Sequence, residues 1–381
     1  MKARTAAMGA ALLAMSQAPV LVAQRMTLPP SGGHQRSTVT QAIGLVEVAV
    51  SYSGPQVTAP DGTDRRGKIW GGLVKYGLQK EAYGTCGDQC PWRAGANENT
   101  VFRVSNPVLV EGKPLPAGAY GLHMIPGADE FTVIFSKSST SWGSYFYTAK
   151  EDALRVAVKP RKAPCTHTLT YEFVERKPDR ATLALRWDEL EIPISITVEN
   201  PTALWVENLG KELRGQQGGT WESWDEAAGY CLRNKVNLPE ALKWADYAAH
   251  ATYVGVENFQ TLSTLSDAQA ANSLADESKK TMQKALSHPT ATAAEIHGYG
   301  RQLQMQGKTP EAIVAFELNA KRYPGVWPVN VGLARANAAA GKPKEALKYA
   351  KLALAQAPDE PNKANLKKVV EMLEAGKEWK Q

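Results

Sequence analysis

The sequence predicts an α+β multidomain protein, in which an antiparallel β-sandwich or barrel-like domain precedes an all-α array of tetratricopeptide-like helical repeats. Two observations support this fold class. Residues 37–200 contain short runs of alternating apolar and polar side chains, whereas residues 221–376 contain amphipathic, alanine-rich segments with a 34-residue repeat. The length of 381 residues also fits two domains.

The overall composition is that of a folded protein with little affinity for nucleic acid. Hydrophobic residues make up 43% of the chain and charged residues 22%. The 44 basic and 38 acidic residues give a formal charge of only +6, and no basic run is interleaved with aromatic residues. We therefore expect no nucleic-acid partner.

Residues 1–25 have the pattern of a signal peptide or an N-terminal anchor. Lys2 and Arg4 precede an apolar stretch at residues 6–15. Cleavage after Ala23 is one interpretation; an uncleaved membrane anchor at residues 6–23 is the other. Both predict an exported, periplasmic protein, held at the outer face of the inner membrane if the segment is retained.

Strands are predicted wherever apolar side chains alternate with polar ones. Residues 46–52 and 100–104 show this period of two, which buries one face of a strand and leaves the other in water. Further strands are predicted at residues 131–135, 154–158, 169–173, 181–187 and 192–198, with turns at 114–118 and 126–127. This number of short strands favours a sandwich or a barrel.

The character of the chain changes after Pro201. Residues 204–213 are predicted to be helical, and the glycines within residues 215–219 break that helix. Residues 201–220 are therefore predicted to form a linker helix and loop.

A 34-residue repeat is visible in the helical part. Residues 307–313 (GKTPEAI) are followed 34 positions later by residues 341–347 (GKPKEAL). This spacing is typical of tetratricopeptide helix pairs and predicts pairs at residues 293–323 and 327–356. Four pairs from residue 221 and a capping helix at residues 360–376 complete the predicted array. An ordinary helical bundle is the alternative.

Repeat arrays of this kind present a concave face that commonly holds a peptide or protein. The sequence therefore favours one or more protein partners. A purely structural role, in which the array docks onto the neighbouring domain, is the alternative.

Four cysteines are present, two of them close together. Cys86 and Cys90 lie in a Gly- and Asp-containing turn, where a disulfide, two free thiols or a zinc site are possible interpretations. Because the six histidines are scattered singly, no metal site is expected. Cys165 and Cys231 are expected to be buried thiols.

Polar residues that could bind a ligand gather near residue 93. Arg93 with Asn97 and Glu98 could grip a carboxylate or a sugar hydroxyl, or Arg93 and Glu98 could instead stabilise a tight loop. His123 is a lone histidine and could lie on either face of the sheet. Trp142 begins an aromatic segment with Tyr145 and Tyr147 along one predicted strand, which could stack on a sugar ring or belong to the core.

Recognised catalytic motifs are missing from the sequence. It contains no nucleophile elbow, zinc-binding helix motif, phosphate loop or dinucleotide fingerprint. We therefore expect no enzyme activity, no catalytic residue and no cofactor.

The N-terminal domain resembles the bacterial family DUF2911. Residues 69–74 (IWGGLV), 92–100 (WRAGANENT) and 112–118 (GKPLPAG), together with Trp142-Gly143, carry the resemblance, which extends from about residue 38 to 198. The family is uncharacterised, so the resemblance implies no activity. It implies that a helical repeat extension can follow the domain.

The chain departs from the family pattern in two places. An extra stretch at residues 60–65 lengthens one loop, and residues 79–91, with both Cys86 and Cys90, form a second insertion. These insertions are expected to mark an interface peculiar to this protein.

Together these features predict an exported, non-enzymatic binding or assembly protein. It would dock onto a protein partner as an accessory or scaffold subunit of a larger, membrane-bound complex. The alternative is a protein that binds a glycan or small ligand, or hydrolyses one, through Arg93, Glu98, His123 and Trp142.

Overall fold

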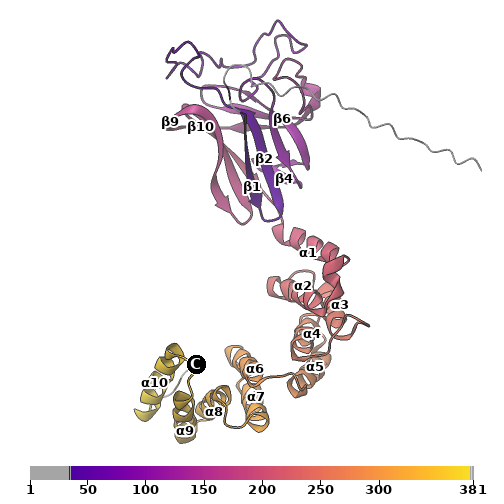
Figure 1. Ribbon diagram of the computed structural model, residues 1–381, viewed down its shortest axis with the longest axis vertical. Coiled ribbons are helices and arrows are strands. Elements are labelled where there is room, and N and C mark those ends of the chain that lie inside the picture. The colour runs from indigo at the N-terminus through magenta and orange to yellow at the C-terminus, as the bar shows by residue number, and fades with distance from the viewer. Residues whose placement is uncertain (1–33, 35, 378, 380–381) are drawn as a thin grey trace, which may run out of the picture. The chain divides into compact units, whose positions relative to one another are not determined.

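The chain forms two compact units that divide between Glu199 and Asn200 (Figure 1). The computed structural model describes residues 34, 36–377 and 379. The predicted signal peptide or anchor, residues 1–25, lies outside the described residues. An N-terminal β-rich unit and a C-terminal α-helical unit confirm the predicted fold class.

The β-unit contains two antiparallel sheets. The first has six strands in the order β1-β2-β3-β6-β7-β8, and the second has four in the order β5-β4-β10-β9. The strands are β1 (Arg36–Ile43), β2 (Val46–Ser53), β3 (Thr100–Val104), β4 (Val108–Val110), β5 (Lys113–Leu115), β6 (Gly118–Ile125), β7 (Phe131–Ser136), β8 (Asp152–Val158), β9 (Arg161–Lys177) and β10 (Arg180–Thr197).

Alternation along the strands places apolar side chains between the two sheets. On β2, Val48 and Val50 are buried and pair with Val104 and Phe102 of β3. The ring of Tyr52, also on β2, lies 4.9 Å from that of Tyr171 on β9. The first sheet therefore packs against the second, as a sandwich requires.

The structure corrects two predictions about the strands. Residues 181–187 and 192–198 were predicted as separate strands, but β10 passes through both. The register shifts around Asp188, which has φ 52°, so the chain bulges there instead of turning back. The predicted turn at residues 114–118 is also partly wrong, because Lys113–Leu115 forms the edge strand β5.

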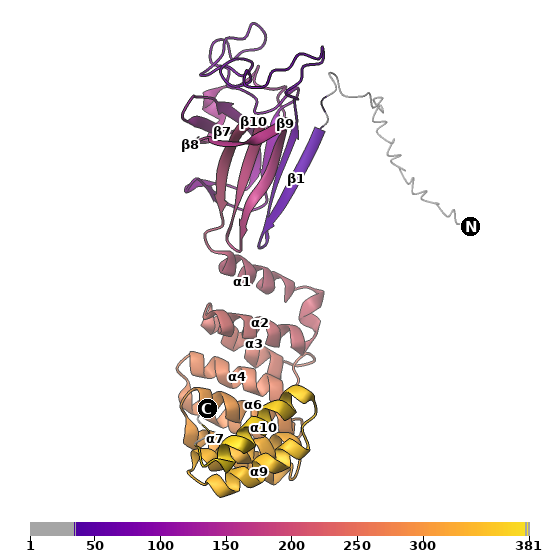
Figure 2. The same cartoon turned by 90° about the vertical axis from the view of Figure 1, so that its left-hand side faces the viewer.

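The helical unit is a series of short antiparallel helices stacked in chain order (Figure 2). The helices are α1 (Pro201–Glu212), α2 (Trp221–Asn234), α3 (Leu238–His250), α4 (Phe259–Ala271), α5 (Ala275–Ser287), α6 (Ala293–Met305), α7 (Thr309–Arg322), α8 (Trp327–Ala339), α9 (Pro343–Ala355) and α10 (Glu360–Glu374). None of the helices in the described part of the chain is long and apolar enough to span a membrane.

The 34-residue repeat of the sequence is also a repeat of the structure. Helices α4, α6 and α8 begin at residues 259, 293 and 327. Gly307 and Gly341 follow α6 and α8 with φ 75° and 70°, a left-handed conformation that ends a helix at little cost when the residue is glycine. Each of these glycines therefore separates the two helices of a pair.

The segment predicted as a linker, residues 201–220, contributes to the core of the helical unit. It contains α1 and the short 3-10 helix Gln216–Gly219. Leu213 is buried in the same cluster as Ala228 of α2 and Trp244 of α3, and Val206 and Leu209 of α1 pack against that cluster.

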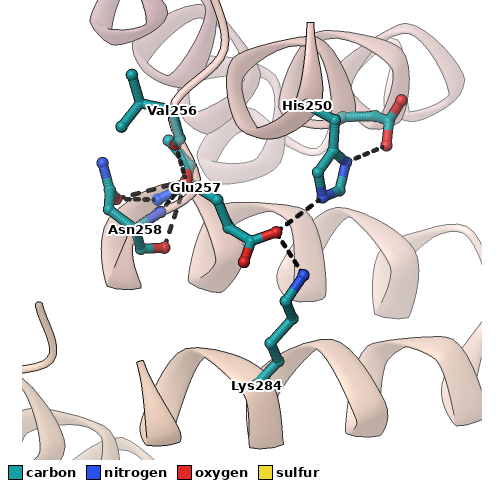
Figure 3. A network of polar contacts seen from close by, with 7 residues as sticks. His250, Val256, Glu257, Asn258 and Lys284 are labelled. Carbon is teal, nitrogen blue, oxygen red and sulfur yellow. Dashed lines mark hydrogen bonds and ion pairs between the residues drawn. The ribbon is translucent and has the colours of Figure 1, made fainter. Parts of the chain in front are cut away.

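The loop between α3 and α4 is tied to the helices on both sides (Figure 3). The Glu257 carboxylate accepts a hydrogen bond from Lys284 of α5 and lies 3.7 Å from Nε2 of His250 on α3. His250 in turn pairs with Asp246 through Nδ1 at 2.9 Å. Asn258 then caps α4 by accepting from the Thr261 amide at 2.9 Å. Adjacent helix pairs are therefore joined through one loop residue.

The packing of the repeats can be tested at Phe316 of α7, whose ring contacts glycines of the two neighbouring helices. A Cβ atom at Gly300 of α6 would lie 2.5 Å from its buried ring, and one at Gly332 of α8 would lie 2.7 Å away. We expect Gly300→Ala to lower the free energy of unfolding by about 1–3 kcal/mol, because overpacking outweighs the better helix propensity of alanine. Urea denaturation followed by circular dichroism measures this change.

Gly298→Ala on the same helix is the matched control. Gly298 is exposed, and a Cβ atom there would meet nothing within 4 Å. This variant should gain up to about 1 kcal/mol from helix propensity alone. Equal stabilisation by both substitutions would contradict the packing described for Phe316.

Candidate functional site

A polar cavity lies beside Arg93 in the loops of the β-unit. Its volume is about 230 Å³, and its wall combines the segments 73–75, 79–81 and 90–93 with Ser144 and Tyr145. Lys75, Lys80 and Arg93 contribute positive charge to the wall, against the single carboxylate of Glu81. The cavity is therefore suited to an anionic or hydroxyl-rich ligand.

The loop that carries Arg93 is docked onto the first sheet. Trp92 exchanges two backbone hydrogen bonds of 2.8 Å with Met124 of β6, beyond the end of β3. Its ring stacks on Trp187 of β10 with centroids 6.4 Å apart. Trp92 thus fixes the backbone of the neighbouring Arg93 against both sheets.

The Arg93 side chain is itself held in place. Its Nη1 donates to the carbonyl oxygen of Asn97 at 2.8 Å, and its guanidinium lies over the ring of Tyr145 at 4.7 Å. Gly143 makes this approach possible, since a Cβ atom there would collide with the guanidinium. A guanidinium fixed in this way presents its remaining donors to the cavity in one orientation.

Asn97 and Glu98 belong to the tight loop and are not among the residues that line the cavity. Asn97 turns the chain with φ 58°. One oxygen of Glu98 accepts a hydrogen bond from the Ser53 hydroxyl at 3.0 Å, so Glu98 does not pair with Arg93. Asn97 thus has a partner within the loop, and Glu98 has one on β2.

His123 lies behind the cavity wall. It is 2% exposed, its Nδ1 lies 2.9 Å from the hydroxyl oxygen of Ser144, and its ring contacts that of Tyr147. Burial, followed by the positive charge of Arg93, lowers the pKa of His123 to about 4. The imidazole is therefore neutral near pH 7.

Ser144 is one of the cavity residues that were not predicted from the sequence; the charged residues Lys75, Lys80 and Glu81 are others. A serine hydroxyl hydrogen-bonded to a neutral imidazole is the arrangement that activates a nucleophile. Ser144 is almost fully buried, however, so the pair fits a structural link between the wall and β6 better. The one sequence signal for Ser144 was its place directly after Trp142-Gly143.

Trp142 does not join the other candidates. It is 48% exposed and is not among the residues that line the cavity. The expectation that Trp142, Tyr145 and Tyr147 share a strand is wrong, because residues 141–146 form bends and turns and Tyr147 lies outside any strand. Arg93 thus lines the cavity, as do Tyr145 and Cys90, and His123 reaches it through Ser144. Asn97, Glu98 and Trp142 are not among the lining residues.

A disulfide joins Cys86 to Cys90 within the insertion at residues 79–91. The bonded pair packs against Ile134 of β7 and Tyr147 in a small buried cluster, and Cys90 also lines the cavity. Of the other two cysteines, Cys231 is buried as expected, whereas Cys165 is exposed, contrary to expectation. Among the described residues, no group of three or more side chains could hold a metal ion.

The helical unit has a second candidate site, an apolar groove of about 290 Å³. Helices α5, α6 and α7 supply its walls. The apolar side chains that line it are Met282, Leu286, Tyr299, Leu303, Val314, Ala315 and Leu318. The repeat pattern of the sequence predicts a binding face for the array but does not identify these residues.

Comparison with protein families bears on the β-unit. Residues 34–196 match the family model described as "Protein of unknown function (DUF2911)". The β-unit therefore matches DUF2911. This finding confirms the resemblance drawn from the sequence, and the helical unit lies outside the matched residues. A search of curated proteins gave no significant match.

Solved structures with helical repeats match part of the chain. The crystal structure of MamA is 18% identical, covers 44% of this chain and 93% of its own, and has a TM-score of 0.30. Pseudomonas aeruginosa pilF is 18% identical with coverages of 42% and 74% and a TM-score of 0.30. YrrB, titled a TPR protein with an unusual peptide-binding site, is 18% identical with coverages of 44% and 84% and a TM-score of 0.29. At these scores the description of the helix pairs rests on their own geometry.

Burial of neutral His123 makes the β-unit sensitive to acid. The pKa of His123 is about 4 in the folded chain against an ordinary 6.5, so between these values the unfolded chain binds a proton that the folded chain does not. Its contribution to stability is complete above pH 6.5 and falls as the pH drops towards 4. Between pH 7 and pH 5 we expect a loss of about 2 kcal/mol.

Hydrogen exchange of β6 amides at the two pH values measures this loss within the β-unit. His123→Gln keeps a polar side chain that cannot titrate. Between pH 7 and pH 5 its free energy of unfolding should therefore fall by about 2 kcal/mol less than that of the wild type. The same pH dependence in both proteins would rule out His123 as its source.

Proposed function

We propose that this protein is an exported, non-enzymatic binding or assembly protein whose helical array holds a protein partner. It would serve as an accessory or scaffold subunit of a larger, membrane-bound complex. The observation that carries the proposal is the apolar groove on α5, α6 and α7.

The groove exposes apolar surface that a helical unit without a partner would be expected to bury. Val314 of α7 is 64% exposed at its edge, and the groove wall is mainly aliphatic. Continuous apolar patches on soluble domains commonly mark protein interaction sites. A groove between helices fits a helix or an extended segment with apolar anchors at regular spacing.

Export is supported by the N-terminal sequence and by cysteine chemistry. Lys2 and Arg4 precede the apolar stretch at residues 6–15, as in secretory signals. The bond between Cys86 and Cys90 is of a kind that persists in oxidising compartments such as the periplasm. Both features favour a periplasmic location for the complex.

A second candidate function belongs to the β-unit, namely binding of a small ligand or glycan in the cavity beside Arg93. The observation that favours it is the excess of cations on the cavity wall, where Lys75, Lys80 and Arg93 face one carboxylate, Glu81. An acidic sugar would satisfy the fixed guanidinium of Arg93.

The groove is tested by Val314→Asp in the tagged full-length protein, purified from its own membranes and soluble fraction in mild detergent. A partner that co-purifies in stoichiometric amount with the wild type should be lost, since a carboxylate in the groove would have to be desolvated on binding. Leu352→Asp on α9, which alters an exposed apolar side chain outside the groove, is the control and should retain the partner. Wild-type protein that elutes alone from both fractions would refute the proposal.

The second candidate is tested by thermal unfolding with a panel of acidic and neutral sugars. Lys80 is exposed at the cavity wall, so Lys80→Gln should keep the fold while weakening any anionic ligand. We expect an acidic sugar to raise the Tm of the wild type and to have a smaller effect on the variant. If no sugar raises the Tm of the wild type, this candidate is excluded for the sugars tested.

A further inference from the structure

The repeat places two arginines at equivalent positions of successive helices. Arg301 is the ninth residue of α6 and Arg335 the ninth of α8. Both line a cavity of about 330 Å³ together with Asn365 and Val369 of α10. The cavity therefore lies along one row of helices, α6, α8 and α10.

In the part of the chain that the structure describes, no carboxylate lines this cavity with the two arginines. Among the described residues, neither arginine forms an ion pair with a carboxylate, whereas many exposed lysines of the same unit do. Burial, followed by the like charge of Arg301, lowers the pKa of Arg335 to about 10. Burial and then the charges of Arg335 and Arg301 also lower the pKa of the nearby His297 to about 4. This part of the unit thus holds an uncompensated positive potential.

Two residues that line this cavity each have a polar atom without a hydrogen-bond partner among the described residues. Nε of Arg335 and Oε1 of Gln304 are both buried and unpaired. Most buried polar atoms in folded proteins are paired, and an unpaired one is costly unless a ligand or water completes it. Both side chains line the same cavity, so an occupant that accepts and donates hydrogen bonds would complete their pairing.

The Arg335 guanidinium is already held in one plane. It lies over the ring of Trp379 at 4.7 Å, which restricts its rotation before any ligand arrives. A planar guanidinium with free donors matches a carboxylate, which can accept two parallel hydrogen bonds from it. The geometry favours a carboxylate over a neutral group.

We propose that Arg301 and Arg335 bind a carboxylate of an acidic peptide segment in the partner protein. This inference rests on the proposed function and adds the chemistry of the partner. Gln304 and Asn365 would serve the peptide backbone, and Met305, which is 76% exposed, would contact apolar side chains beside the acidic one. Asp267 holds the ninth position of α4, so the acidic segment would lie over α6 to α10 and not over α4.

The test uses the full-length protein and two fluorescein-labelled hexapeptides in fluorescence anisotropy. One contains leucine, aspartate and glutamate; the other replaces the acids by asparagine and glutamine. We expect binding of the acidic peptide alone, weakened by added salt, with a Kd that rises about tenfold or more in Arg335→Gln and in Arg301→Gln. Equal binding of both peptides by the wild type would overturn the proposal.

Two matched variants separate the cavity from overall charge. Lys321→Gln removes an exposed positive charge on α7 and should leave the Kd unchanged. Asp267→Asn removes a negative charge at the equivalent position of α4 and should leave binding unchanged or tighten it. If Lys321→Gln weakened binding as much as Arg335→Gln does, binding would reflect net charge alone, and the cavity would be rejected as the site.

Thermal unfolding separates a binding role from a structural one. Because Arg335 is partly buried without an ion pair, Arg335→Gln should keep or raise the Tm of the helical unit. A lower Tm with unchanged peptide affinity would make the arginine structural and overturn the assignment. Inorganic phosphate and vesicles containing phosphatidylserine are run in parallel, and binding to either in place of the peptide would also overturn it.

The outcome is independent of the groove on α5, α6 and α7. If a partner co-purifies and Val314→Asp releases it, but the acidic peptide does not bind, this inference alone fails. If no partner co-purifies, but the acidic peptide binds and Arg335→Gln abolishes that binding, the cavity is supported as a carboxylate-binding site and the proposed assembly role is refuted.

Discussion

Close approach of neighbouring helices is the constraint on which the helical unit depends. Helices of this length gain little stability by themselves, so they must bury a face against the next helix. Glycine or alanine therefore occupies the points of contact. Phe316 fills the space that Gly300 and Gly332 leave open, and Ala346 and Ala350 of α9 are fully buried beside α8. Small residues recur at the helix contacts of successive pairs. Side chains at equivalent positions therefore form rows along the array, and such a row can form a binding surface.

The β-unit solves a different problem, because its sheets are filled by their own side chains. Val48, Val50 and Phe102 are fully buried in the space between the sheets. The cavity is instead formed by loops, and these loops keep their shape only if other contacts hold them to the sheets. Trp92 provides one through its backbone pairing with β6 and its contact with Trp187. The disulfide between Cys86 and Cys90 provides another.

The two units also treat buried charge differently. In the β-unit, the buried carboxylate of Glu191 accepts hydrogen bonds of 2.5 Å from both Arg161 and Arg186, so the charge is compensated within the fold. In the helical unit, Arg301 and Arg335 share a cavity to which the described residues contribute no carboxylate. A compensated charge adds to the specificity of a fold, whereas an uncompensated one is retained at a cost in stability. That contrast is why the arginine pair, and not the Glu191 network, points to an external ligand.

The sequence by itself determined the order of the two units and many of their elements, because these follow from local patterns, whereas strands β1, β4, β5 and β6 were not predicted. Period-two alternation located β2 and β3, and the 34-residue repeat located α6 to α9 and the capping helix α10. Motif residues identified the DUF2911 match. Tertiary structure decided the rest. Local alternation cannot distinguish a bulge at Asp188 from a turn, nor show that Trp142 leaves the site while Ser144 enters it. It also cannot show that Arg301 and Arg335, 34 residues apart, line one cavity. Burial and pairing depend on what other segments bring within a few ångströms, and that information is held by the folded chain as a whole.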